Sequence, residues 1–138
     1  MSISKYISES EAETRKIAAE FAKKLRGDEK ICLVGPLGSG KTTFVRGFVE
    51  AFGISSANVQ SPTFTLIREY VNHRTVYHID LYRLEKEEDI FEAGIFDVIT
   101  SSALVLIEWA DRLEQYYPAP SILVRFEQLQ EGRAIEIL

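Results

Sequence analysis

Several residue types that mark particular protein classes are scarce in this sequence. Cys32 is the one cysteine among 138 residues, so no internal disulfide can form. It lies in the apolar run Ile31–Val34, where we expect a small buried thiol. Lys and Arg number 16 against 21 Asp and Glu, which gives a formal net charge of −5. That balance argues against binding of naked DNA or RNA through phosphate neutralisation, so any connection with RNA is expected to be indirect.

Long apolar stretches are missing as well. No run approaches the roughly 20 residues that a helix needs to span a bilayer. Residues 1–15 are polar and acid-rich, unlike the basic and then apolar start of a secretory signal. The sequence shows no internal repeat, low-complexity tract or linker rich in Pro, Gly or Ser. With 46% hydrophobic residues, we predict one domain over residues 1–138 that is cytoplasmic and not membrane-bound.

The first half of the sequence contains the helix and strand signals of an α/β domain. A capping-box spacing and apolar residues at helical intervals predict a helix over about Ser10–Arg26, closed by Gly27. The apolar run Lys30–Val34 predicts a buried strand. Apolar residues at positions 44–52 recur every three to four residues and predict a second helix, with Gly53 as its stop.

The second half alternates β-rich and helical stretches. A hairpin-length turn joins the first two β-rich stretches, so we expect them to pair antiparallel. The expected elements are strands over Phe64–Val71 and Thr75–Ile79, helices over Glu85–Ala93 and Ile95–Thr100, a strand over Ala103–Ile107, a short helix before Pro118, and a strand pair over Ile122–Phe126 and Ala134–Leu138. Together these elements predict a three-layer α/β domain with a mixed, parallel and antiparallel, sheet.

The strongest motif lies between the first predicted strand and the second predicted helix. The segment Gly35-Pro36-Leu37-Gly38-Ser39-Gly40-Lys41-Thr42 matches Gly-x-x-x-x-Gly-Lys-Ser/Thr, the phosphate-binding P-loop of NTPases. Its glycines let backbone N–H groups surround a phosphate at the positive end of the helix. A lysine at a helix N-terminus is unfavourable unless an anion is present, which favours nucleotide binding. The expected nucleotide ligands are Gly38, Ser39, Gly40, Lys41, Thr42 and Thr43.

Two acids stand where a bound magnesium ion would meet the nucleotide. Lys41 is expected to reach the β- and γ-phosphates of ATP, and Thr42 to offer its hydroxyl to Mg2+. Asp80 and Glu108 each follow a predicted strand, at the end where open α/β sheets hold their ligand. Either acid can bind Mg2+ directly or through water. The structural alternative is that Asp80 caps a turn and pairs with Arg83, while Glu108 caps the next helix.

Other polar and aromatic residues allow more than one interpretation. Ser61–Thr65 is either a loop that senses the γ-phosphate or a plain turn before an edge strand. Trp109 either packs over the site or anchors the end of its strand. His73 and His78 lack a second His or Cys at metal-binding spacing and are expected to be structural or solvated. The acidic run Glu85–Asp89 is expected to be a solvated helix face, with docking of a partner as the alternative.

Missing motifs narrow the class of P-loop protein. The sequence contains no Asn-Lys-x-Asp, which reads guanine in GTPases, and no Leu-Ser-Gly-Gly signature of transporter ATPases. A small-molecule kinase stays open as an alternative, with Arg46, Arg68 and Arg83 as candidate acceptor-binding residues. Both remaining classes use ATP.

Four segments together resemble a known family. They are Gly35–Thr43, Val59–Leu66, His78–Arg83 and Glu108-Trp109. In order, type and spacing they are similar to those of the bacterial TsaE (YjeE) ATPases, which take part in making the threonylcarbamoyladenosine modification of tRNA. The resemblance covers nearly the whole chain. Its Ser-Pro-Thr and Asp-Leu-Tyr-Arg motifs are far more specific than the phosphate loop alone.

The resemblance implies a function and assigns roles to residues. It implies a Mg2+-dependent ATPase, slow alone, that is coupled to a TsaD–TsaB complex in which TsaD transfers the threonylcarbamoyl group. Thr42 and Glu108 carry over as Mg2+ ligands, and Asp80 as a second acid needed for hydrolysis. Ser61–Leu66 carries over as a switch-like loop.

Two further positions are assigned by the resemblance, and two depart from it. Glu11 and Arg133 are implied to lie near the nucleotide, although helix capping explains Glu11 equally well. Pro36 stands where the family commonly has an acidic residue, and Ala110-Asp111 stands where proline is common. Because the side chain of residue 36 is not needed to cradle phosphate, this change is expected to alter loop rigidity and not activity.

Overall fold

The computed structural model of the chain describes residues 4–59, 67–81, 94–110 and 121–138. Three predicted features therefore lie outside the described residues: the Ser61–Thr65 loop, the helix over Glu85–Ala93 and the short helix before Pro118. No helix among the residues described is both long and apolar enough to cross a membrane.

Within the described residues, seven strands form one mixed sheet in the order β1-β7-β6-β2-β5-β4-β3. Strands β6, β2, β5 and β4 run parallel, whereas β7, β1 and β3 are joined antiparallel at the two sides. The strands are β1 Ser4–Ser8, β2 Lys30–Val34, β3 Ile67–Val71, β4 Thr75–Asp80, β5 Leu104–Glu108, β6 Ser121–Gln128 and β7 Arg133–Ile137. The helices are α1 Glu11–Ala22, α2 Lys41–Glu50, the short 3-10 helix η1 Ser56–Asn58 and α4 Ile95–Ile99.

Most of the predicted elements are confirmed. The mixed α/β sheet is present, β2 has the predicted bounds, and both predicted antiparallel pairs form over their described residues. The first helix was predicted too long, because α1 ends at Ala22 and turns follow it. Strand β1 was not predicted. Its sequence, SKYIS, is polar, and its pairing with β7 at the opposite end of the chain is what makes it a strand.

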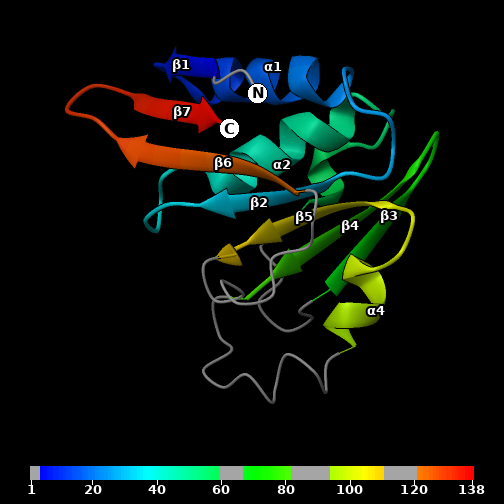
Figure 1. The fold of residues 1–138 in the computed structure, drawn as a ribbon. Coiled ribbons are helices and arrows are strands. Elements are labelled where there is room, and N and C mark those ends of the chain that lie inside the picture. The colour runs from blue at the N-terminus through cyan, green and yellow to red at the C-terminus, as the bar shows by residue number, and fades with distance from the viewer. Residues whose placement is uncertain (1–3, 60–66, 82–93, 111–120) are drawn as a thin grey trace.

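The sheet separates two apolar layers. Helices α1 and α2 cover one face and α4 covers the other (Figure 1). Because strand side chains alternate between faces, Ile31 and Leu33 pack toward α2 while Cys32 packs with α4. Cys32 is buried as predicted, and this burial raises the pKa of its thiol to about 11. The thiol is thus a packing group with little thiolate at neutral pH.

The two helices on the first face approach each other closely at Gly47. A Cβ atom built at this glycine would collide with the backbone of Arg15 on α1. Nearby, Arg15 Nε lies 3.0 Å from Glu50 Oε1, and the rings of Phe21 and Phe44 are 6.0 Å apart. Because α2 begins directly after the phosphate loop, this contact with α1 holds the loop's helix in place.

We predict that Gly47→Ala destabilises the protein even though alanine is the better helix former by about 1 kcal/mol. The added methyl group has no room against the Arg15 backbone, and overpacking of this kind costs about 1–3 kcal/mol. Urea unfolding followed by circular dichroism measures the change. Lys16→Ala, at an exposed position of α1, serves as the control with little expected effect. Equal or greater stability of Gly47→Ala would contradict the close approach.

Candidate functional site

The phosphate loop and the two acids lie at one edge of the sheet because β2, β4 and β5 run parallel. Strand β2 runs into the phosphate loop, β4 ends at Asp80 and β5 ends at Glu108. Since β5 pairs parallel with both β2 and β4, these three ends meet at the same edge. The register places Asp80 directly beside Glu108.

The phosphate loop is shaped by glycines that adopt left-handed backbone angles. Gly38 has φ of 77°, and Gly40, the N-cap of α2, has φ of 103°. The N–H of Ser39 donates to the carbonyl of Pro36 at 3.2 Å. The side-chain Nε2 of Gln128, at the end of β6, donates to the carbonyl of Gly38 at 2.9 Å. The loop is therefore tied to the β6 end as well as to its own helix.

Lys41, the first residue of α2, is folded back into the loop. Its Nζ donates to the carbonyl of Gly35 and, at 3.3 Å, to that of Pro36. The same nitrogen lies 3.6 Å from the centre of the Trp109 ring, which is a cation–π distance. Trp109 has φ of 59°, a left-handed conformation that non-glycine residues seldom adopt. Of the two interpretations of Trp109, the structure thus supports packing over the site.

The acids face the helix that carries the phosphate loop. Thr42 Oγ1 donates to Glu108 Oε1 at 3.2 Å, and the second oxygen of Glu108 lies 2.5 Å from His78 Nε2. Glu108 is 3% exposed and Asp80 is 8% exposed. His78 is fully buried, which confirms a structural position, but sequence reasoning did not foresee its contact with Glu108.

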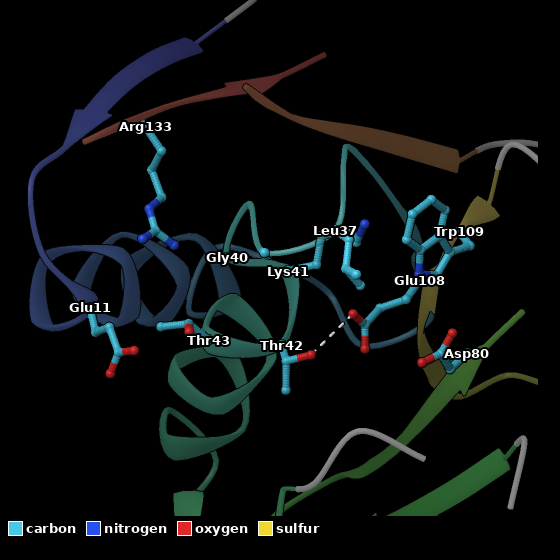
Figure 2. Close-up of a pocket in the computed structure, with 11 residues that line it drawn as sticks. Glu11, Leu37, Gly40, Lys41, Thr42, Thr43, Asp80, Glu108, Trp109 and Arg133 are labelled. Carbon is cyan, nitrogen blue, oxygen red and sulfur yellow. Dashed lines mark hydrogen bonds between the residues drawn. The ribbon is translucent and has the colours of Figure 1, made fainter. Parts of the chain in front are cut away.

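A pocket of about 280 Å³ connects these groups. Figure 2 shows Asp80, Glu108 and Trp109 on one side of Lys41, and Arg133 with Glu11 and Thr43 on the other. The pocket is lined by Glu11, Leu37, Gly38, Gly40, Lys41, Thr42, Thr43, Asp80, Glu108, Trp109 and Arg133. All of the predicted site residues except Ser39 therefore line one cavity.

The side chain of Ser39 and the candidate kinase arginines lie elsewhere. Ser39 is buried, and its Oγ has no hydrogen-bond partner among the residues that the structure describes. Arg46 donates to the carbonyl of Val59 at 3.4 Å and does not line the pocket. Arg68 does not line it either, and Arg83 lies outside the described residues. The described structure thus gives no specific support to the kinase alternative.

Sequence reasoning missed two contributors to this edge. Leu37 lines the pocket while remaining 70% exposed. Gln128 contacts the phosphate loop from the last position of β6, which runs parallel to β2. The predicted strand ended at Phe126, two residues before Gln128, and its parallel pairing with β2 was not predicted.

The donors present fit a magnesium ion shared with a nucleotide better than a metal cage made by protein alone. In the described part of the chain, no group of three or more His, Cys, Asp or Glu is arranged to hold a metal. Magnesium in nucleotide sites is typically held by one or two carboxylates together with substrate phosphates. The Thr42 hydroxyl and the Glu108 carboxylate, with Asp80 beside them, provide oxygen donors of that kind.

The chain is similar to one protein family in sequence and to a solved structure in fold. A family model described as "Threonylcarbamoyl adenosine biosynthesis protein TsaE" matches residues 8–135. A protein of Rickettsia felis named tRNA threonylcarbamoyladenosine biosynthesis protein TsaE is 38% identical over 126 residues, covering 91% of this chain and 73% of its own. The protein of that name from Haemophilus influenzae is 38% identical over 123 residues, covering 87% and 77%.

The fold comparison agrees with the sequence comparison. The crystal structure of YdiB from Bacillus subtilis superposes with a TM-score of 0.77 at 28% identity, covering 99% of this chain and 84% of that one. Because the family model spans nearly all of the sequence and relatives above 30% identity cover most of it, this chain belongs to the TsaE family of tRNA threonylcarbamoyladenosine biosynthesis proteins.

Proposed function

We propose that this chain binds ATP with Mg2+ in the pocket at the carboxyl edge of the sheet and hydrolyses it slowly. Hydrolysis would serve tRNA threonylcarbamoyladenosine biosynthesis through a TsaD–TsaB complex. The observation that carries the proposal is the contact between Thr42 of the phosphate-loop helix and Glu108 at the end of β5. It brings the expected phosphate-binding and magnesium-binding halves of an ATPase site together.

Phosphate binding would use the loop backbone and Lys41. The first turn of an α-helix leaves N–H groups without an intrahelical partner, and α2 would direct these groups and the positive end of its dipole toward an anion. Lys41 Nζ contacts the carbonyls of Gly35 and Pro36. On binding ATP, the ammonium would exchange at least one of these partners for oxygens of the β- and γ-phosphates. The charge-assisted bonds formed are stronger than bonds to neutral carbonyls.

The metal would be held where Thr42 and Glu108 meet. When bound, Mg2+ neutralises charge on the β- and γ-phosphates and so favours departure of the γ-phosphoryl group. The Thr42 hydroxyl and the Glu108 carboxylate would hold it, directly or through water. Asp80, one strand away in the same register, would hold the attacking water through its carboxylate oxygens. Burial of both acids limits competing bulk water at this end of the pocket.

The opposite end of the pocket would hold the rest of the nucleotide. Arg133 lies over Gly40, so closely that a Cβ at this glycine would meet its guanidinium. Figure 2 shows the Arg133 side chain on the side away from Asp80 and Glu108. Arg133 is therefore a second cation for the nucleotide, but among the described residues Lys41 is the cation on the acid side of the pocket lining. A slow intrinsic rate follows from this arrangement.

We predict that Lys41→Ala weakens ATP binding at least tenfold. A hydrogen bond to a charged group contributes about 1.5–3 kcal/mol, and Lys41 is the loop cation nearest the expected phosphates. Isothermal titration calorimetry with ATP and Mg2+ measures the affinity, and circular dichroism confirms folding. Lys24→Ala, at an exposed position, is the control. Parental affinity in folded Lys41→Ala would disprove the phosphate assignment.

Asp80→Asn and Glu108→Gln are expected to separate hydrolysis from binding. Each variant should bind ATP with an affinity within about tenfold of the parent protein, because phosphate contacts dominate binding. Each should lose most of the hydrolysis rate. The measurement is release of free radiolabelled phosphate from γ-labelled ATP at saturating Mg2+. Label transferred to a metabolite would instead favour the kinase alternative. A variant that hydrolyses ATP at the parental rate would show that its acid is a structural cap.

The third prediction concerns the partner complex. An arginine supplied by a partner accelerates phosphoryl transfer by roughly 10³–10⁵ in known systems, so we expect TsaD–TsaB to raise the ATPase rate about tenfold or more. Affinity for the complex should be higher with a non-hydrolysable ATP analogue than with ADP or without nucleotide. Rates and affinities are compared in parallel, with Lys41→Ala as the nucleotide-free control. Equal affinity in all three states with an unchanged rate would remove support for coupling.

A further inference from the structure

His78 has its side chain fully buried beside the acids of the site. Its Nε2 lies 2.5 Å from Glu108 Oε2. A carboxylate that binds a metal ion accepts hydrogen bonds, so in the proposed site Nε2 would carry the hydrogen and donate it to Glu108. The opposite oxygen of Glu108 accepts from Thr42 at 3.2 Å. Both oxygens of Glu108 are therefore held, one by the sheet and one by the phosphate-loop helix.

The geometry of the parallel strands produces this contact. His78 pairs with Leu106 in the β4–β5 register, so Glu108 lies one step further along the same face. Side chains of Val76, His78 and Asp80 share that face because strand side chains alternate. Val76 packs in the layer beneath α2, which shows that this face looks toward the phosphate-loop helix.

A second contact fixes the plane of the imidazole ring. The Tyr70 ring on the neighbouring strand β3 stacks on His78, with centroids 6.4 Å apart and an angle of 29° between the planes. Tyr70 is itself 7% exposed. The imidazole is thus held between Tyr70 on one side and the Glu108 carboxylate at its edge, with little freedom to rotate.

We propose that His78 is a positioning residue that orients the Glu108 carboxylate, leaving Oε1 directed toward Thr42 and the bound metal. A glutamate carboxylate has three rotatable side-chain bonds, so without a fixed partner it would sample several orientations. Outer hydrogen bonds of this kind set the geometry of metal-binding carboxylates. The inference rests on the proposed function, because it needs Glu108 to hold Mg2+. The simpler alternative is that His78 only fills space in the core.

Two amide substitutions separate positioning from packing. The amide of His78→Gln reaches the place of Nε2 and can donate to Glu108, whereas the shorter amide of His78→Asn cannot. The readout is the ratio of dissociation constants for a non-hydrolysable ATP analogue without and with Mg2+, measured by calorimetry. We expect His78→Asn to reduce this ratio about tenfold or more, with binding in EDTA unchanged. His78→Gln should retain most of the parental ratio.

Val76→Ala is the matched control, since this buried residue lies on the same face of β4 and pairs with Leu104 instead of Glu108. It should lower the unfolding midpoint and leave the Mg2+ ratio unchanged. A parental ratio in folded His78→Asn would contradict the positioning role of His78 and leave the proposed Mg2+ site standing. Equal losses in the Asn and Gln variants would do the same. If Mg2+ does not change nucleotide binding by the parent protein, the result contradicts the proposed Mg2+ site at Glu108. The positioning role of His78, which depends on that site, is then contradicted as well.

Discussion

The parallel pairing of β2, β5 and β4 is the constraint on which the site depends. Residues of the phosphate loop, Asp80 and Glu108 are far apart in sequence, and they meet because parallel strands end at a common edge. The ladder continues past the strand ends, where the N–H of Leu81 donates to the carbonyl of Glu108 at 3.1 Å. That bond fixes the positions of Asp80 and Glu108 relative to each other along the two strands. A shift of one residue in this register would turn the acids to the opposite face of the sheet.

Strand side chains alternate between the two faces of the sheet, so core residues and the acids of the site can share one face of a strand. On β5, Leu104 and Leu106 pack beneath α1 and α2, and Glu108 follows on the same face at the strand's last position. The edge that carries Asp80 and Glu108 is therefore an extension of the apolar layer and not a separate surface. The close contact of α2 with α1 at Gly47 holds the two helices of that layer together. Packing and phosphate-loop position are consequently coupled through one helix.

The two ends of the chain build the other wall of the pocket. Strand β7 lies between β6 and β1, and the register aligns Arg133 with both Gln128 and Ser8. Gly132 passes so close to the Ser8 backbone that a Cβ there would collide with it, and its φ of 77° also suits glycine. This turn brings Arg133 to the N-terminus of α1, where Glu11 begins the helix. The antiparallel side of the sheet thus supplies the far end of the pocket that we propose for the nucleotide.

The sequence by itself determined what depends on local pattern: the bounds of β2, the phosphate loop, the strand-ending acids and, through four motifs, the family. It also placed Cys32 in the core, because an apolar run has no other stable location. Strand β1 was not accessible from sequence, since its polar residues form a strand only by pairing with the far end of the chain. The same holds for the contact of His78 with Glu108 and of Gln128 with Gly38. These contacts join separate strands, so the tertiary structure alone decides them: register and sheet order set which polar groups become neighbours, and no local spacing encodes that choice.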